Sequence, residues 1–507
     1  MARISVMMCA EGTYPFNHGG VSVWCDQLIR GLPEFEFKIF AITSSSDKKP
    51  VFGVPLNVTE TLPVALWETQ ELGCQVATFA ETYQRKLRTT RSIIRKEFLE
   101  SFRKVCECIV SGGRSPETLA HGLLKLHLYF RRFDFATTMT SPQAWETFLD
   151  VCQSEFPNGR ELTINDVTIC LRWMQRFLGI LSVPLPRADI AHGSISGLAS
   201  VPGVLNKLLT GAPFLLTEHG IYMRELYISL MRLGQSNACR RFLLALNQAI
   251  VTMNYHHADL VTTLGTFNKS WQMEFGACES KIHITPNGTD HERFQTPLRS
   301  RRDRPVVVTL ARIYRLKGIE FLLRAAALVK AQFGPAQFRI LGEVVDHEYF
   351  RECQKFIAEN GLEGMVDFGY TDNPAAALRD ADIFCLPSIS EGMPYCILEA
   401  MFSGLPVIAT DVGNVREMLE NTGIVVPPAD PNLLAEAILS LLHDPETAHA
   451  RRLSLGQAGE QRALSLYTTK QAVGRFREIY QSLIYERNTA KVHTASAIRE
   501  VGMGATA

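Results

Sequence analysis

The C-terminal half of the chain alternates short apolar runs with amphipathic stretches, and this alternation restricts the possible fold more than any other feature. Apolar runs predict six strands, at residues 306–310, 338–341, 366–368, 383–386, 407–409 and 423–426. Between them the spacing of apolar residues predicts helices, for example over Ile319–Gln332 and Pro431–Leu442. Strands that alternate with helices build a parallel sheet with helices on both faces. Ligands of such sheets bind beyond the carboxyl ends of the strands, so the site residues are expected in the loops that follow them.

The N-terminal part predicts the same α/β architecture with a helical insertion. An apolar strand at 4–9, a helix at 21–32 and a second strand at 35–42 form a βαβ opening. Strand patterns return at residues 188–192, 214–218 and 260–263. From about residue 66 to 177 the sequence is rich in Leu, Arg, Phe and Glu at helical spacing, which predicts an insertion with breaks near 111–113 and 156–159.

A charged stretch over residues 299–304 predicts a linker between two domains. We therefore expect an N-terminal domain at 1–298 and a C-terminal domain at 299–468, with the carboxyl ends of their strands around one cleft. A helix at 469–487 is expected to cross back to the first domain, and residues 488–507 are expected to form a disordered tail. At 507 residues the chain is long enough for two or three domains.

Composition excludes few functions but favours a globular cytoplasmic protein. Lys plus Arg and Asp plus Glu both number 52, so the net charge of zero gives no support for a nucleic-acid partner. No N-terminal signal peptide and no apolar run of about 18 residues is visible. The 12 Cys include no CxxC pair, which indicates reduced thiols. Cys106 and Cys108 lack zinc-knuckle spacing, and Asp346 with His347 has no further ligand nearby, so no metal is predicted.

Two carboxylates bracket a Gly/Pro turn that leads into a helical pattern. Glu391 lies in the loop, and Glu399 lies about two turns into the helix. Carboxylates accept hydrogen bonds from sugar hydroxyls, and the free N–H groups of a helix start suit a phosphate. Taken alone, the segment fits two interpretations equally well: a nucleotide-sugar site, or an exposed loop followed by an ordinary surface helix.

A basic pair follows the first strand of the C-terminal domain. Arg312 and Lys317 could both reach a diphosphate and stabilise the negative charge of a departing nucleotide. The alternative is that both side chains are ordinary solvated cations in a loop. Because the loop follows the carboxyl end of a strand, diphosphate binding and this alternative are about equally well supported. Glu343 ends the second strand of this domain, where a loop would contact the base and ribose of a nucleotide.

The N-terminal domain offers weaker signals at the ends of its strands. Gly19 and Gly20 open the first helix and would let the backbone approach a phosphate, although a simple tight turn is the commoner explanation of such a pair. His219 could bond a sugar hydroxyl or a transition-state group, but a structural His is the commoner case. An acceptor-side site is predicted from Glu218, Arg224 and Glu225, with an ordinary surface ion pair between the last two as the alternative.

Together these segments resemble a known family. From Glu391 to Glu399 the chain resembles the E-x7-E signature of retaining GT-B glycosyltransferases of family GT4. Arg312 and Lys317 look like that family's R-x4-K pair, which binds the donor phosphates. The continuation is also similar, over Gly404–Thr410 and Gly413–Glu417.

The N-terminal half looks like the PelF-type branch of that family, on the evidence of residues 11–24 and 217–225. That branch contains the cytoplasmic transferase of Pel exopolysaccharide synthesis, and its members carry a helical insertion. The resemblance implies two Rossmann-like domains and retaining transfer of a hexose from a UDP-sugar, with UDP-glucose expected, to a growing glycan. It implies no metal or other cofactor, membrane-bound synthase or export subunits as partners, and a location at the inner face of the membrane.

The resemblance also assigns roles to single residues. It implies catalytic roles for His219, Arg312, Lys317 and Glu391. It implies donor binding by Gly19, Gly20, Glu343, Ile397, Leu398 and Glu399, with Glu399 on the ribose. Two alternatives stay open: a GT-B nucleotide-sugar epimerase, and a non-catalytic UDP-sugar-binding subunit of a membrane synthase.

Overall fold

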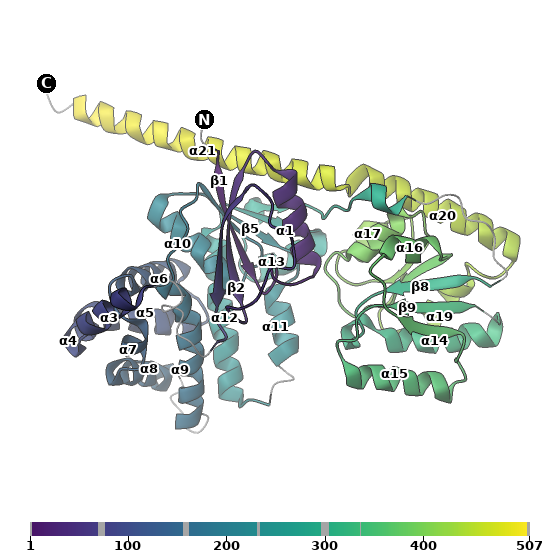
Figure 1. Ribbon diagram of the computed structural model, residues 1–507, viewed down its shortest axis with the longest axis horizontal. Helices are drawn as coiled ribbons and strands as arrows, with labels where there is room; N and C mark the ends of the chain where they lie inside the picture. The colour runs from purple at the N-terminus through teal and green to yellow at the C-terminus, as the bar shows by residue number, and fades with distance from the viewer. Residues whose placement is uncertain are drawn as a thin grey trace. The chain divides into compact units, whose positions relative to one another are not determined.

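The computed structural model describes residues 3–68, 77–155, 162–230, 234–295, 304–334 and 336–503. The chain divides into two compact units, each built on its own sheet (Figure 1). Unit 1 consists of Met1–Thr263, Lys269–His283 and Phe476–Ala507, and unit 2 of Leu264–Asn268 and Ile284–Arg475. The predicted boundary at residue 298 lies outside the described residues. The expected fold class, with two α/β sheets, is confirmed.

The sheet of unit 1 has seven strands in the order β3-β2-β1-β4-β5-β6-β7. They are β1 (Ser5–Glu11), β2 (Glu36–Thr43), β3 (Val58–Ala65), β4 (Ile190–Gly193), β5 (Phe214–Glu218), β6 (Leu260–Thr263) and β7 (Ile282–Ile284). β1 pairs in parallel with both β2 and β4, with Val6 opposite Phe37 and Ile190. Its centre is wholly buried because helices cover both faces of the sheet, which explains the continuous apolar run. The strand order reverses between β1 and β4.

The predicted insertion is helical. It contains α3 (Phe79–Arg88), α4 (Arg91–Ile93), α5 (Leu99–Val110), α6 (Pro116–Phe130), α7 (Phe135–Met139), α8 (Pro142–Glu155) and α9 (Ile164–Gly179). The predicted break at 111–113 lies between α5 and α6, where Gly113 has φ 81° and a Cβ would come within 2.6 Å of the Ala249 Cα. The other predicted break, at 156–159, lies outside the described residues.

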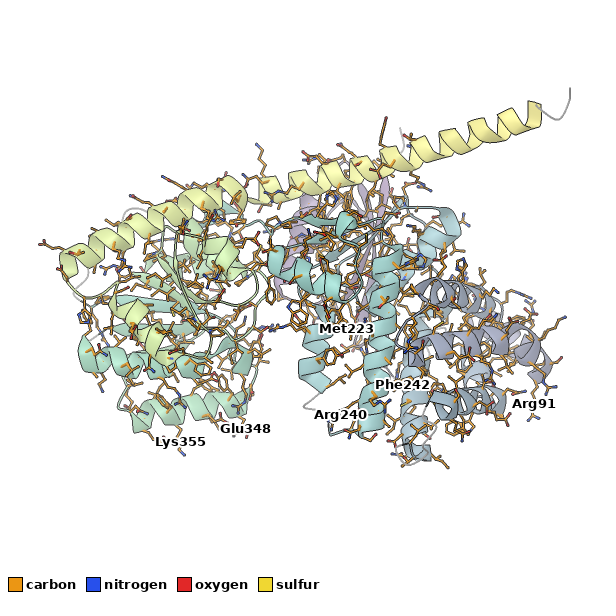
Figure 2. All side chains as sticks on the ribbon, turned by 180° about the vertical axis from the view of Figure 1, so that it is seen from behind. Arg91, Met223, Arg240, Phe242, Glu348 and Lys355 are labelled. Atoms are coloured by element: carbon orange, nitrogen blue, oxygen red, sulfur yellow. The ribbon has the colours of Figure 1, made fainter. Side chains whose placement is uncertain are left out.

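The insertion shares one hydrophobic core with the sheet of unit 1. The remaining helices are α1 (Gly20–Gly31), α10 (Val201–Thr210), α11 (Tyr222–Leu230), α12 (Asn237–His257) and α13 (Thr266–Glu274). Phe242 on α12, labelled in Figure 2, contacts Phe148 of α8 edge to face, with 5.8 Å between the ring centroids. α12 therefore packs the insertion against the α/β core.

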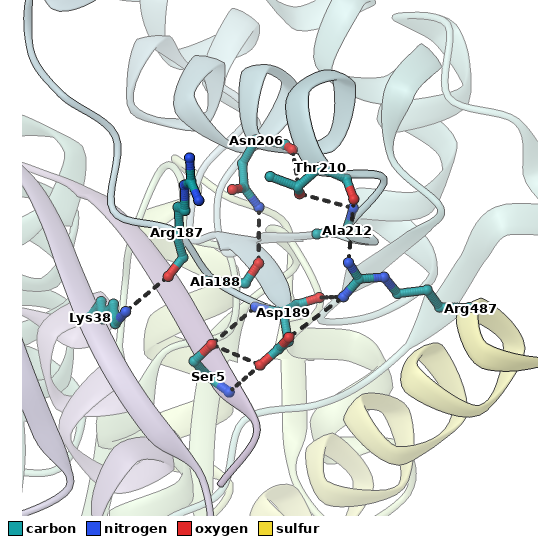
Figure 3. A network of polar contacts seen from close by, with 9 residues as sticks. All are labelled: Ser5, Lys38, Arg187, Ala188, Asp189, Asn206, Thr210, Ala212 and Arg487. Carbon is teal, nitrogen blue, oxygen red and sulfur yellow. Dashed lines mark hydrogen bonds and ion pairs between the residues drawn. The ribbon is translucent and has the colours of Figure 1, made fainter. Parts of the chain in front are cut away.

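The last helix, α21 (Thr469–Met503), contributes its residues from Phe476 onward to unit 1. Arg487 donates hydrogen bonds to the carbonyls of Asp189 and Thr210, at 3.1 and 3.3 Å (Figure 3). The Asp189 carboxylate in turn accepts from the backbone N–H and the hydroxyl of Ser5, at 3.0 and 2.8 Å. This network fixes the helix at the amino ends of β1 and β4.

α21 extends to Met503, across most of the stretch for which the sequence predicts a disordered tail. Between Asn488 and Val501 the sequence holds no Gly or Pro that would end a helix, which accounts for this difference. The final four residues lie outside the described part of the chain. Within the described residues, no helix is long and apolar enough to span a membrane.

Unit 2 has a six-stranded sheet in the order β10-β9-β8-β11-β12-β13. Its strands are β8 (Val306–Leu310), β9 (Gln337–Leu341), β10 (Val366–Gly369), β11 (Ile383–Leu386), β12 (Val407–Thr410) and β13 (Ile424–Val426). Its helices are α14 (Ile319–Gln332), α15 (His347–Glu359), α16 (Pro374–Arg379), α17 (Tyr395–Phe402), α18 (Val415–Leu419), α19 (Pro431–Leu439) and α20 (Pro445–Leu466). Two buried clusters, on opposite faces of the sheet, form its core. The strand order reverses between β8 and β11, which pair in parallel.

Candidate functional site

The predicted basic pair and the first carboxylate of unit 2 follow the two strands at which its sheet order reverses. The loop after β8 carries Arg312 and Lys317, and the loop after β11 carries Glu391. Ligands of doubly wound sheets bind at this switch point, beyond the carboxyl ends of the strands. The backbone N–H of Ile389 donates to the Leu316 carbonyl at 2.8 Å and so joins the two loops.

Lys317 and Glu391 meet across this switch point. The Nζ of Lys317 donates to Oε1 of Glu391 at 2.5 Å, and the two side chains are only 15% and 10% exposed. The Ser388 hydroxyl donates to the same oxygen at 2.6 Å. Burial lowers the pKa of Lys317, but the Glu391 carboxylate and Tyr314 more than offset this, so the pKa is raised and the ammonium stays charged.

This arrangement leaves capacity for a ligand on both partners. An ammonium has three donors, and Lys317 uses one of them on Glu391. Among the described residues, no hydrogen bond to Oε2 of Glu391 occurs, so this oxygen can accept from a hydroxyl. The pair therefore combines a cation for phosphate oxygens with an acceptor for a sugar hydroxyl.

Arg312 lies beside the same loop and is exposed. Its guanidinium lies 5.6 Å from the ring centroid of Tyr314, and the Nζ of Lys317 lies 5.9 Å from that centroid. The Tyr314 ring thus contacts both cations and restrains their positions through cation–π attraction. No sequence pattern singles out Tyr314 beyond its place in the loop.

A left-handed glycine ends the loop that carries Lys317. Gly318 has φ 60°, and a Cβ there would lie 2.2 Å from the Pro387 carbonyl oxygen. Only glycine fits this approach, which brings the β8 and β11 loops together at the start of α14. Gly413 makes a similar approach, because a Cβ there would lie 2.2 Å from the Glu391 carbonyl oxygen.

The second predicted carboxylate lies on α17. Burial raises the pKa of Glu399 to about 7, against a lowering influence of Arg293. The side chains of Ile397 and Leu398 are wholly buried in the core, so only their backbone could meet a ligand. Glu343 is exposed just after β9, and its carbonyl accepts from the Ile313 N–H at 2.7 Å. These four residues keep the donor-binding roles expected of them as hypotheses.

In unit 1, Gly19 and Gly20 lie at the start of α1, after β1, and both are exposed. Gly19 has the extended backbone φ 163°, ψ 167°, and open space surrounds the position of a Cβ. The position is therefore accessible without being strained.

His219 follows β5, and its ring packs against Trp24 edge to face at 4.5 Å between centroids. Its neighbour Glu218 is buried, and the carboxylate accepts from the Tyr222 N–H and from Gln272, both at 3.1 Å, and from the Tyr255 hydroxyl. Burial raises the pKa of Glu218 to about 7, against the lowering effect of these donors. The structure places Glu218 where it holds the turn that carries His219.

The other two predicted acceptor-side residues lie in the first turn of α11. Arg224 is partly exposed and Glu225 is exposed. A Cβ on Gly220 would lie 2.3 Å from Oε1 of Glu225, so a larger residue there would displace the end of this flexible side chain. The structure gathers His219, Arg224 and Glu225 within one strand-to-helix turn of unit 1.

A buried polar chain, which was not predicted from the sequence, starts at His192, close to His219. The Nδ1 of His192 on β4 lies 2.7 Å from the Tyr480 hydroxyl of α21, and Nε2 lies 2.6 Å from the Thr217 hydroxyl of β5. Thr217 also lies 2.5 Å from the Thr262 hydroxyl of β6. A His and two Thr within apolar strands were the signal available, because buried polar groups need partners.

His192 makes the stability of unit 1 depend on pH. Burial lowers its pKa to about 3, and the nearby His219 adds to this. The folded chain keeps the imidazole neutral, whereas the unfolded chain protonates it below about 6.5. The contribution of His192 to the free energy of unfolding is therefore fully present above about pH 6.5. It is lost, by about 1 kcal/mol per pH unit, as the pH falls toward 3.

The variant His192→Gln should lose less stability than the native chain when the pH is lowered from 6.5 to 4.5, because it has no imidazole to protonate. Urea unfolding at the two pH values measures the free energy of unfolding. Equal losses in the variant and the native chain would contradict the role of His192.

Two sequence families match the chain. Residues 4–280 match the family described as "Domain of unknown function (DUF3492)", which covers more than half of the chain. Residues 304–444 match the family described as "Glycosyl transferases group 1". The second match contains Arg312, Lys317, Glu343, Glu391 and Glu399.

Curated proteins with related sequences are glycosyltransferases. The amylovoran biosynthesis glycosyltransferase AmsK of Erwinia amylovora is 29% identical over 34% of this chain and 46% of its own length. The D-inositol 3-phosphate glycosyltransferase of Pseudarthrobacter chlorophenolicus is 29% identical over 55% of this chain and 67% of its own. The chain spans about half the length of most of the curated relatives it matches.

Solved structures share the fold at low sequence identity. Sucrose-phosphate synthase from Thermosynechococcus elongatus superimposes with a TM-score of 0.60 at 18% identity, over 96% of this chain and 100% of that chain. Anabaena Alr3699/HepE in complex with UDP superimposes with a TM-score of 0.50 at 19% identity, over 58% and 79%. The two parallel sheets are thus those of a GT-B fold. The chain belongs to the DUF3492 family, and its second unit is a group 1 glycosyltransferase domain of the GT4 type.

Proposed function

We propose that this protein transfers a hexose from a UDP-sugar to a glycan acceptor with retention of configuration. The observation that carries the proposal is the Lys317–Glu391 pair at the switch point of unit 2, which joins a cation to a carboxylate with one free oxygen. A nucleoside diphosphate sugar offers the matching groups, namely phosphate oxygens beside sugar hydroxyls. UDP-glucose is the proposed donor, in line with the UDP complex of the HepE protein that shares the fold.

In this proposal the donor is held mainly by unit 2. Lys317 and Arg312 bind the diphosphate and stabilise its charge as the bond from the anomeric carbon to the phosphate oxygen breaks. Glu391 accepts a hydrogen bond from a donor-sugar hydroxyl through Oε2, and Glu399 accepts from the ribose. Glu343 and the backbone at Ile397 and Leu398 complete the donor site.

Unit 1 supplies the remaining roles. His219 contacts the donor sugar near the reacting carbon, and Gly19 and Gly20 bring the backbone at the start of α1 to the phosphates. Arg224 and Glu225 bind the acceptor, and Glu218 keeps the turn between β5 and α11 in place. The acceptor we propose is a growing exopolysaccharide of the Pel type, handed on to membrane-bound synthase or export subunits from the cytoplasmic side.

A ligand screen tests the donor class directly. The full-length protein is heated with UDP-, GDP- and ADP-sugars, and the midpoint of unfolding is recorded for each. A ligand at 100 times its dissociation constant stabilises by about 2.7 kcal/mol, which is easily measured. UDP-glucose should give the largest rise. A larger rise with GDP- or ADP-sugars would overturn the choice of donor.

Incubation without acceptor separates transfer from epimerisation. A transferase should release UDP only when a glycan acceptor, or slowly water, takes the sugar. Conversion of the UDP-sugar to its epimer with no UDP released would replace the proposal by an epimerase. Binding with neither reaction in the presence of Pel-type oligosaccharides would leave a non-catalytic UDP-sugar-binding subunit.

Glu399→Gln should weaken UDP binding by about 10-fold or more, because a hydrogen bond to a charged acceptor contributes about 1.5–3 kcal/mol. Calorimetry at pH 8 measures this, since the pKa of about 7 leaves the carboxylate mainly ionised there. The exposed Glu436→Gln on α19 serves as the matched control and should bind like the native chain. Equal affinity of Glu399→Gln and the native chain would remove Glu399 from the ribose site.

A further inference from the structure

Two helices of unit 1 bring a carboxylate and two imidazoles together outside the loops that follow the carboxyl ends of the strands. Glu117 lies in the first turn of α6, and His256 and His257 end α12. One atom of each side chain could bind a metal ion, and these three atoms all lie within 4.8 Å of one another. Within the described residues, no other group of three His, Cys, Asp or Glu side chains meets this limit. The sequence could not indicate the group, because its members lie on elements far apart in the chain.

Two distances within this group are compatible with one metal ion shared by the three side chains. The Nε2 atoms of His256 and His257 each lie 3.3 Å from Oε2 of Glu117. For metal–ligand bonds of roughly 2.0–2.1 Å, two ligand atoms of a tetrahedral zinc site lie about 3.3–3.4 Å apart. An octahedral site with bonds of the same length would bring neighbouring ligands to about 3 Å. The two observed distances are compatible with tetrahedral coordination.

His257 supplies a second observation that points to a ligand. Its side chain is only 6% exposed, and its Nε2 is buried with no hydrogen-bond partner among the described residues. A buried polar nitrogen without a partner costs roughly 1–3 kcal/mol, so such groups are rare in folded proteins. The nitrogen faces the Glu117 carboxylate at 3.3 Å without hydrogen-bond geometry. A cation between the two would satisfy both.

The surroundings hold the three side chains in place and leave a route to solvent. Lys207 and Lys281 donate to the carbonyls of His257 and His256, at 2.8 and 3.0 Å, which fixes the end of α12. His121 lies one turn after Glu117, and its Nδ1 is 3.4 Å from the other carboxylate oxygen. Glu117 and His256 are each about half exposed, so an ion can enter from solvent.

Helix-end electrostatics alone would not produce this group. An acidic residue at the start of α6 and His residues at the end of α12 each suit the local helix dipole. That preference acts on each helix separately, however, and does not explain why both imidazole nitrogens meet one carboxylate oxygen. Imidazole nitrogens bind Zn²⁺ well, whereas Mg²⁺ and Ca²⁺ prefer oxygen ligands.

We propose that Glu117, His256 and His257 form a zinc-binding site that links the helical insertion to the α/β core of unit 1. Each residue supplies one ligand atom, and water completes the tetrahedron. The site joins the start of α6 to the end of α12, so the ion fastens the insertion to the helix that precedes β6. It lies on other elements than the residues proposed for transfer, and its role is structural.

Cobalt spectroscopy on the untagged, full-length protein tests this site. The chain is treated with a chelator, exchanged into metal-free buffer and titrated with Co²⁺, whose visible absorption is strong in tetrahedral sites. One equivalent should bind, and Zn²⁺ should displace it. Zn²⁺ should also raise the midpoint of thermal unfolding by at least about 2 °C. An octahedral spectrum, or no saturable binding at one equivalent, would overturn the proposal.

Variants at the two half-exposed ligands separate this site from adventitious binding. Glu117→Gln and His256→Gln should each weaken zinc affinity by at least 10-fold and abolish the thermal shift, with circular dichroism unchanged. His283→Gln, at an exposed His of unit 1 outside the group, is the control and should bind like the native chain. Unchanged affinity in both ligand variants would contradict the assignment.

Discussion

Lys317→Ala should lower the rate of sugar transfer by about 10²–10³-fold, the size of effect seen when one donor to a developing negative charge is removed. The ammonium is held at the β8–β11 switch point by Glu391, and its raised pKa keeps it charged through the reaction. Its loss removes stabilisation of the departing diphosphate, so kcat should fall more than UDP affinity. Initial rates of UDP release at saturating donor and acceptor measure the effect.

Arg315→Ala is the matched control for this variant. Arg315 lies in the same short turn, is 43% exposed and pairs with Glu352 at 2.6 Å on the surface. Exposed pairs contribute little, so this variant should keep nearly native turnover and stability. Similar losses in the two variants would mean that the turn as a whole, and not the Lys317 ammonium, supports catalysis. Near-native turnover by Lys317→Ala would defeat its role.

Most of the two sheets could be predicted because parallel strands buried on both faces are continuous apolar runs. Phe214–Glu218, Leu260–Thr263 and Val306–Leu310 are strands with the predicted bounds. β3 was missed because Val58–Ala65 carries Thr59, Glu60 and Pro63, as a partly exposed edge strand does. β7 has three residues, too few to show a pattern.

The candidate site could be predicted where charged residues directly follow a predicted strand. Arg312, Lys317 and Glu391 lie in loops directly after strands, and a sheet of known order brings such loops together. Sequence reasoning could not show that Lys317 and Glu391 bond to each other, because that depends on β8 and β11 being neighbours. For the same reason the hydrogen bonds of His192 could not be predicted. They require that β4 pairs with β5 and that α21 brings Tyr480 to β4.

The metal group shows a different limit. A pair of adjacent His residues at a helix end carries no meaning until its third ligand is known, and Glu117 belongs to a different helix. Glu117 and the two His residues form a group only because α6 packs against the end of α12.

Glu391→Ala should reduce transfer by about 10²-fold or more, because it removes both the proposed sugar acceptor and the partner that orients Lys317. The loss should appear in kcat and in the KM for donor, whereas Ser388→Ala, which removes one donor to Glu391, should cost about 10-fold or less. Circular dichroism should show a folded chain for each. Near-native turnover by Glu391→Ala would exclude the residue from the site.

The double variant Lys317→Ala/Glu391→Ala distinguishes a pair from two independent groups. If the two side chains act as one unit, removing both should cost little more than removing either, since each single variant already breaks the 2.5 Å contact. Independent groups would instead multiply their losses, to about 10⁴-fold or more from the single effects expected above. The rate of UDP release by the double variant, measured against the acceptor-free background, decides between these outcomes. A multiplicative loss would assign phosphate binding and sugar binding to separate side chains that only happen to touch.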